Sequence, residues 1–113
     1  MNINITLCDD ERSETIYLAG LVRKWAAMRG VTVRLLDYES AESFLFAYED
    51  NKEIDILLLD IQMQNMDGVE LAHRVRKNNE VVQIIKILNY FLFLSDKMWR
   101  FLLIMTVFKQ KSA

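Results

Sequence analysis

Proline is absent from this chain of 113 residues, and cysteine and histidine occur once each. Cys8 has no second cysteine to pair with, so an internal disulfide is excluded and a reducing cytoplasm is the expected location. His73 has no second ligand at metal-binding spacing, and we expect an exposed or half-buried side chain there. The first residues lack a basic lead and turn acidic by Asp9, so no signal peptide is expected.

Glycine is also scarce, and the three glycines form no phosphate-binding loop, which leaves a nucleotide-binding function without support. The net charge of -2 gives no electrostatic reason to bind nucleic acid or an anionic membrane. The apolar stretch 86–113 is interrupted by charged residues and is therefore not expected to span a membrane. With 52% hydrophobic residues, the chain is expected to fold as one small domain.

Short apolar runs alternate with amphipathic segments along the first three quarters of the chain. The runs predict strands at 3–8, 31–36, 54–59 and 81–87. The segments between them predict helices at 11–30, 40–49 and 69–79. Gly30 is expected to end the first helix, Ser40 to cap the second, and Asp67 with Glu70 to open the third. The predicted fold class is therefore α/β, with a doubly wound parallel sheet.

Hydrophobic side chains at helical spacing predict which face of each helix is buried. The predicted buried face of the first helix consists of Leu18, Leu21, Val22, Trp25 and Met28. That of the second helix consists of Phe44, Leu45 and Tyr48. Trp25, the methionines and Cys8 are expected to pack in the core rather than to act chemically.

Three aspartates lie where predicted strands end. Asp9 and Asp10 follow the first strand, and Asp60 ends the third, LLLD. In a parallel sheet, ligands bind outside the carboxyl ends of the strands, so the three carboxylates meet if these strands are neighbours. Oxygen ligands of this kind suit a hard divalent cation, and Mg²⁺ is the best candidate. For each acid alone, a plain role as a turn or helix-capping residue is the alternative.

The stretches ITLCDDE and IDILLLDIQMQNMDGVELAHRVR resemble the receiver domain of two-component response regulators, over roughly residues 1–85. The segments CDDE and DIQM are most similar to those of receivers attached to LytTR-type DNA-binding domains. This resemblance implies a flavodoxin-like fold with strand order 2-1-3-4-5. It also implies that Asp60 accepts a phosphoryl group from the phosphohistidine of a sensor histidine kinase.

The resemblance further implies a Mg²⁺ site. Asp10 and Asp60 would bind the ion directly, Asp9 through water, and Gln62 through its backbone carbonyl. Such a domain is not an enzyme beyond its own phosphorylation and dephosphorylation. Its partner would be the kinase, and no nucleic acid or membrane would be bound.

Several positions depart from the family pattern. Gln64 stands where similar domains have proline, and Leu88 stands where they have the threonine or serine that reports phosphorylation. Lys109 is a candidate for the usual phosphate-binding lysine, although it equally fits a basic, solvated tail. Thr106 replaces the expected aromatic residue.

These departures keep two alternative functions open. An interaction-only pseudo-receiver is favoured by the missing hydroxyl at Leu88 and opposed by the intact acids. A Mg²⁺-dependent phosphohydrolase with Asp60 as nucleophile is less favoured, because phosphatases of the haloacid dehalogenase type need a second aspartate where Gln62 stands.

Residues 86–113 differ from the rest in charge and pattern. They carry a net charge of +4, against -6 for residues 1–85. We expect a short fourth helix and a fifth strand at 101–108, with too few residues left for a last helix and no effector domain. A truncated or frameshifted product is one hypothesis. The uncovered sheet face predicts a homodimer, through that face or by exchange of the C-terminal segment. A helix at 97–109 that covers the gap is the alternative.

Overall fold

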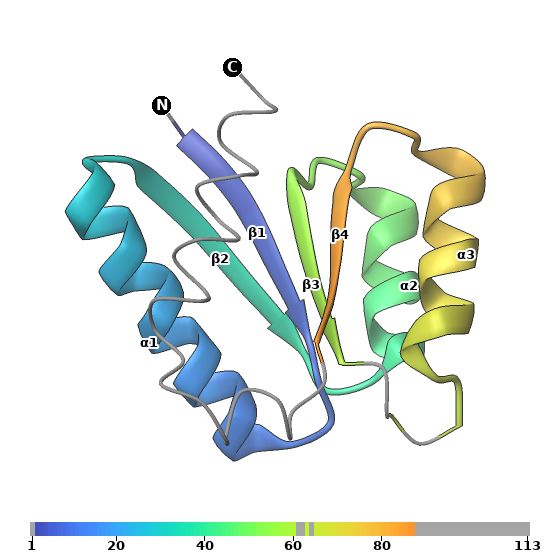
Figure 1. Ribbon diagram of the computed structural model, residues 1–113. Helices are drawn as coiled ribbons and strands as arrows, with labels where there is room; N and C mark the ends of the chain where they lie inside the picture. The colour runs from blue at the N-terminus through green and yellow to red at the C-terminus, as the bar shows by residue number, and fades with distance from the viewer. Residues whose placement is uncertain (1, 61–62, 64, 88–113) are drawn as a thin grey trace.

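The computed structural model describes residues 2–60, 63 and 65–87, which form an open sheet with helices on both faces (Figure 1). Strands and helices alternate strictly along these residues. In chain order the elements are β1 (Asn2–Cys8), α1 (Arg12–Arg29), β2 (Thr32–Tyr38), α2 (Ala41–Asp50), β3 (Ile56–Asp60), α3 (Gly68–Asn78) and β4 (Gln83–Ile87). All seven predicted elements are therefore present, with ends that differ from the prediction by one or two residues.

The sheet has the order β2-β1-β3-β4, and every pair of neighbouring strands is parallel. Ile5 of β1 lies beside Leu35 of β2 on one side and Ile56 of β3 on the other. This arrangement confirms the doubly wound parallel sheet and agrees with strand order 2-1-3-4-5 over the four described strands. The predicted fourth helix, the fifth strand at 101–108 and the alternative helix at 97–109 lie outside the described residues.

Two hydrophobic cores lie on opposite faces of the sheet because successive strand residues point to opposite sides. Ile56 and Leu58 of β3 pack with α1, while Leu57 and Leu59 pack with α2 and α3. Of the described helices, Figure 1 shows α1 on one face of the sheet and α2 with α3 on the other. All five residues of β3 are buried, as expected for a central strand covered on both sides.

Local signals explain where the helices begin and end. The Ser40 hydroxyl accepts a hydrogen bond from the Ser43 backbone N–H at 3.0 Å, and Asp67 accepts one from Glu70 N–H at 2.9 Å. Gly30 ends α1 in the left-handed conformation, with φ at 66°, which glycine adopts without steric cost. The predicted caps at these three positions are confirmed.

The prediction that Met28 of α1 is buried is wrong. Met28 is 67% exposed, although Leu18, Leu21, Val22 and Trp25 are buried as expected. Met28 lies in the last turn, at the margin of the buried stripe, and Ala26 takes the neighbouring buried position instead. In α2, Phe44 and Tyr48 are buried and Leu45 is partly buried, which agrees with the predicted face.

Candidate metal centre

The carboxyl ends of β1 and β3 bring the three predicted aspartates together. Cys8 at the end of β1 is in register with Leu59, the residue before Asp60. The chain beyond Cys8 therefore places Asp9 and Asp10 next to Asp60. One carboxylate oxygen from each aspartate lies within 4.8 Å of the other two. The expectation that strands 1 and 3 are neighbours, and that their acids share one crevice, is confirmed.

The three carboxylates differ in their exposure to solvent. Asp9 and Asp60 are each only 2% exposed, whereas Asp10 is exposed. The cluster is therefore closed toward the core and open on the side of Asp10.

Asp9 combines a structural role with an open coordination position. Its Oδ1 accepts a hydrogen bond from the Glu11 backbone N–H at 2.8 Å, which shapes the turn into α1. Its Oδ2 is buried and accepts no hydrogen bond from the described residues. The plain capping role therefore accounts for one oxygen of Asp9 and leaves the other without a partner, an arrangement that costs free energy unless a cation or a proton is present.

The electrostatics of the cluster also favour a cation or a proton beside the second oxygen of Asp9. The pKa of the Asp9 carboxyl is raised from 3.8 to about 7, chiefly by burial and also by the nearby charges of Asp60, Glu14 and Asp10, while the hydrogen bond from Glu11 N–H acts in the opposite direction. Like charges that are held together in this way favour binding of a divalent cation. The donors are hard oxygen atoms, so the residues fit Mg²⁺ better than a transition metal that prefers nitrogen or sulfur.

Glu14 is a part of this region that the sequence analysis missed. It lies in the first turn of α1, is only 5% exposed, and its charge contributes to the raised pKa of Asp9. Its position could have been found from helical spacing, because it precedes Leu18 by four residues on the buried face. A charged residue on an apolar face is the signal that was available.

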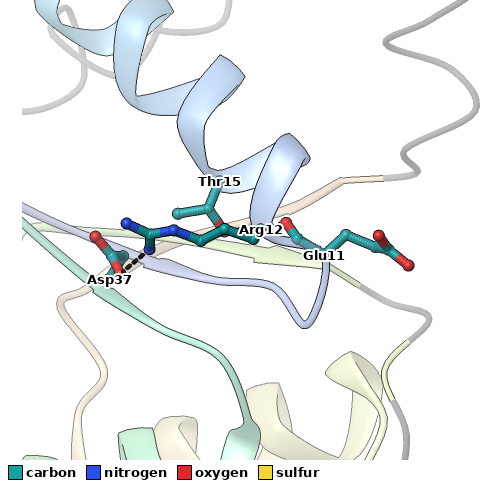
Figure 2. A network of polar contacts seen from close by, with 4 residues as sticks. All are labelled: Glu11, Arg12, Thr15 and Asp37. Atoms are coloured by element: carbon teal, nitrogen blue, oxygen red, sulfur yellow. Dashed lines mark hydrogen bonds and ion pairs between the residues drawn. The ribbon is translucent and has the colours of Figure 1, made fainter.

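A second polar network borders the aspartates at the start of α1 (Figure 2). Arg12 Nη1 lies 3.2 Å from Asp37 Oδ1 at the end of β2, and the Thr15 hydroxyl donates to the Glu11 carbonyl at 3.3 Å. A hollow of about 30 Å³ is lined by Asp9 and Asp10 together with residues of this network. The Arg12 guanidinium is thus directed to Asp37 on β2, as Figure 2 shows.

Cys8 and His73 are not members of the aspartate cluster. Cys8 is fully buried, and its thiol donates to the Ser40 carbonyl at 3.5 Å and lies 3.8 Å from Met63 Sδ. Burial, together with the neighbouring acids, raises the pKa of Cys8 to about 12, so the thiol stays protonated. His73 is exposed on α3. Both observations agree with the sequence analysis.

Several positions that the sequence analysis singled out, Thr106 among them, lie outside the described residues. They also include Gln62, whose backbone carbonyl was expected to bind the metal, Gln64, Leu88 and the candidate phosphate-binding residue Lys109. Their roles stay predictions. Within the part of the chain that the structure describes, no helix is both long and apolar enough to cross a membrane.

Comparison with known proteins identifies the family. The family model for the response regulator receiver domain matches residues 5–89. The chain therefore belongs to the response regulator receiver domain family, which functions in two-component signalling. The finer likeness to LytTR-type receivers stays a prediction. No curated protein sequence matches the chain significantly.

Solved structures of receiver domains share the fold at low sequence identity. A receiver domain protein from Clostridium thermocellum has a TM-score of 0.62 and 20% identity, over 74% of this chain and 63% of that protein. Vibrio cholerae chemotaxis protein CheY4 has a TM-score of 0.61 and 17% identity, over 76% of this chain and 68% of that one. The BeF3-activated DrrB receiver domain has a TM-score of 0.56 and 18% identity, over 85% and 71%. The chain thus spans less than two thirds of the length of the Clostridium structure.

Proposed function

We propose that this receiver domain accepts a phosphoryl group on Asp60 from the phosphohistidine of a sensor histidine kinase, with Mg²⁺ bound by the aspartate cluster. The observation that carries the proposal is the convergence of the three carboxylates at the carboxyl ends of β1 and β3. Asp60 is the last residue of β3, an inner strand of the sheet whose five residues are all buried.

The transfer itself requires little from the protein beyond position and charge. An oxygen of the Asp60 carboxylate attacks the phosphorus atom, the bond from phosphorus to the histidine nitrogen breaks, and its electron pair returns to the imidazole. The product is an aspartyl phosphate. Bound Mg²⁺ supplies positive charge for the transferring phosphoryl oxygens. The chain's own contribution is to hold Asp60 rigidly and to keep Asp9 and Asp10 beside it.

Asp10 and Asp9 have different roles in this proposal. Asp10 is exposed at the open side of the cluster, which supports its proposed role as a direct ligand of Mg²⁺. Asp9 is buried and already uses one oxygen for the Glu11 N–H, so its second oxygen acts on the ion through a water molecule. Gln62 and Lys109 complete the site in the proposal through the resemblance to other receivers. The kinase as partner and a cytoplasmic location belong to the same proposal.

Intact mass measurement tests the proposal. The full chain is incubated with Mg²⁺ and the small phosphodonor acetyl phosphate, and we expect a gain of one phosphoryl group. Asp60→Asn should abolish this gain while circular dichroism shows an unchanged fold. Asp37→Asn is the matched control, because it removes a neighbouring carboxylate outside the cluster, and it should still be phosphorylated.

Three results are informative against the assignment. Phosphorylation mapped to a peptide without residue 60 would refute Asp60 as the acceptor. A folded protein that takes up no phosphoryl group would favour the interaction-only pseudo-receiver, to which Leu88 points. Continuous release of phosphate from many phosphodonor molecules per chain would instead favour the phosphohydrolase.

A further inference from the structure

A hollow of about 950 Å³ is lined by residues of α2 and α3. These two helices cover the face of the sheet opposite α1 (Figure 1). The lining of the hollow also includes Lys52 after α2 and Met66 before α3. None of the three clustered aspartates contributes to it. The phosphorylation chemistry proposed above therefore does not account for this surface.

Part of the lining of the hollow is apolar, and it includes one large, exposed side chain. Leu45, Tyr48 and Met66 line the hollow, and Leu45 and Met66 are partly exposed. Phe46, which also lines the hollow, is 81% exposed. An exposed aromatic ring at a hollow that other apolar side chains also line is a typical feature of protein interfaces.

The two walls of the hollow carry opposite charges. The α2 wall bears Glu42 and Glu49, and the α3 wall bears Arg74 and Lys77, all of them exposed. Arg74 is already in an ion pair with Glu70, at 3.2 Å. Lys52 donates to the Glu49 backbone carbonyl beyond the last turn of α2, at the end of the hollow. Glu49 and Lys77 are therefore the pair of opposite charges that best defines the two walls.

This distribution makes the face complementary to itself. Both helices connect parallel strands, so they run in the same direction and end at the same edge of the sheet. Glu49 and Lys77 each come one residue before the end of their helix, at Asp50 and Asn78. A two-fold axis parallel to the hollow would place α2 of one copy against α3 of the other. Each Glu49 would then face a Lys77.

We propose that the α2–α3 face binds a second copy of this chain as a symmetric dimer. Phe46 of each copy enters the hollow of the other, and the contacts between Glu49 and Lys77 form twice because an isologous interface repeats every contact. Phe46, the hollow and both charged walls lie on a single face. Self-association about a two-fold axis requires this, because each copy must offer both halves of every contact. Neither the bare sheet face nor the C-terminal exchange of the sequence analysis is involved.

Sedimentation velocity over a concentration series tests the proposal, on the full chain without any phosphodonor. The wild-type chain should show a monomer–dimer equilibrium. Phe46→Ser should weaken the dimer by about tenfold or more, as expected for a central aromatic anchor. Ile16→Ser is the matched control, since Ile16 is 60% exposed on α1, and it should leave the dimer unchanged. Both positions are exposed, so neither variant removes core packing.

Charge reversal makes the test specific for the geometry. Glu49→Lys and Lys77→Glu should each weaken the dimer, because like charges then face each other twice. The double variant Glu49→Lys/Lys77→Glu should restore dimerisation to within a few-fold of the wild type. A dimer whose dissociation constant is unchanged by all these substitutions would overturn the proposal. A wild-type chain that is monomeric at every concentration would do the same. Because no phosphodonor is present, either result leaves the proposed phosphorylation of Asp60 untouched.

Discussion

The buried carboxyl of Asp9 makes the stability of the fold depend on pH in a defined direction. Its pKa is raised from 3.8 to about 7 in the folded chain, mainly by burial. Between these two values the folded state holds a proton that the unfolded state releases, so the free energy of unfolding must fall as pH rises. The loss of unfolding free energy is absent below about pH 4 and is complete above about pH 7.

The variant Asp9→Asn should remove this pH dependence while it keeps the turn intact. The amide oxygen of asparagine can still accept the hydrogen bond from Glu11 N–H. A pKa shift from 3.8 to about 7 corresponds to about 4 kcal/mol of unfolding free energy, since each unit of pKa is worth about 1.4 kcal/mol. Exposed Asp10 opens one side of the cluster to water, which screens the charges, so we expect roughly half, about 2 kcal/mol.

Urea unfolding at several pH values measures this effect. Without divalent cations, the difference in unfolding free energy between Asp9→Asn and the wild type should grow in favour of the variant by about 2 kcal/mol from pH 4 to pH 8. Mg²⁺ at pH 8 should shrink the difference, because the ion stabilises the ionised wild-type cluster. A difference that stays constant from pH 4 to pH 8 would refute the reasoning.

Two further predictions concern single side chains. Asp10→Ala should reduce Mg²⁺ affinity, measured by calorimetric titration, more than Asp9→Ala does, because Asp10 is the exposed and direct ligand in the proposal; equal, undiminished titrations in both variants would show that the acid pair serves only as a cap. Asp67→Ala should lower the free energy of unfolding by about 1 kcal/mol through loss of the bond to Glu70 N–H, whereas Asp50→Ala, at the other end of a helix, should show no such loss of a cap.

Much of the fold could be predicted because local pattern and tertiary packing agree. The continuous apolar run of β3 predicted a strand covered on both faces, and Ser40, Asp67 and Gly30 marked helix ends through their own chemistry. Met28 could not be placed correctly, because helical spacing gives the angle of a side chain around α1 but not where the sheet beneath it ends.

The candidate site was partly predictable for a similar reason. Strand ends gave the positions of Asp9, Asp10 and Asp60, and parallel topology brought them together. Their unequal burial could not be read from the sequence, since it depends on how the surrounding elements pack against the cluster in three dimensions. Glu14 was missed because a charge on a buried helix face becomes visible only against the predicted packing of that helix.

The strand order also has a consequence for how the chain folds. Among the four described strands β1 comes first along the chain, yet it pairs with β3, so that Ile5 must come to lie beside Ile56. The centre of the sheet is therefore a contact between distant parts of the chain, and such contacts slow folding because the intervening loop must close first. During synthesis, β1 stays without its partner β3 until residue 60 has left the ribosome. The three aspartates meet at that same moment, so metal affinity would appear together with the completed sheet rather than before it.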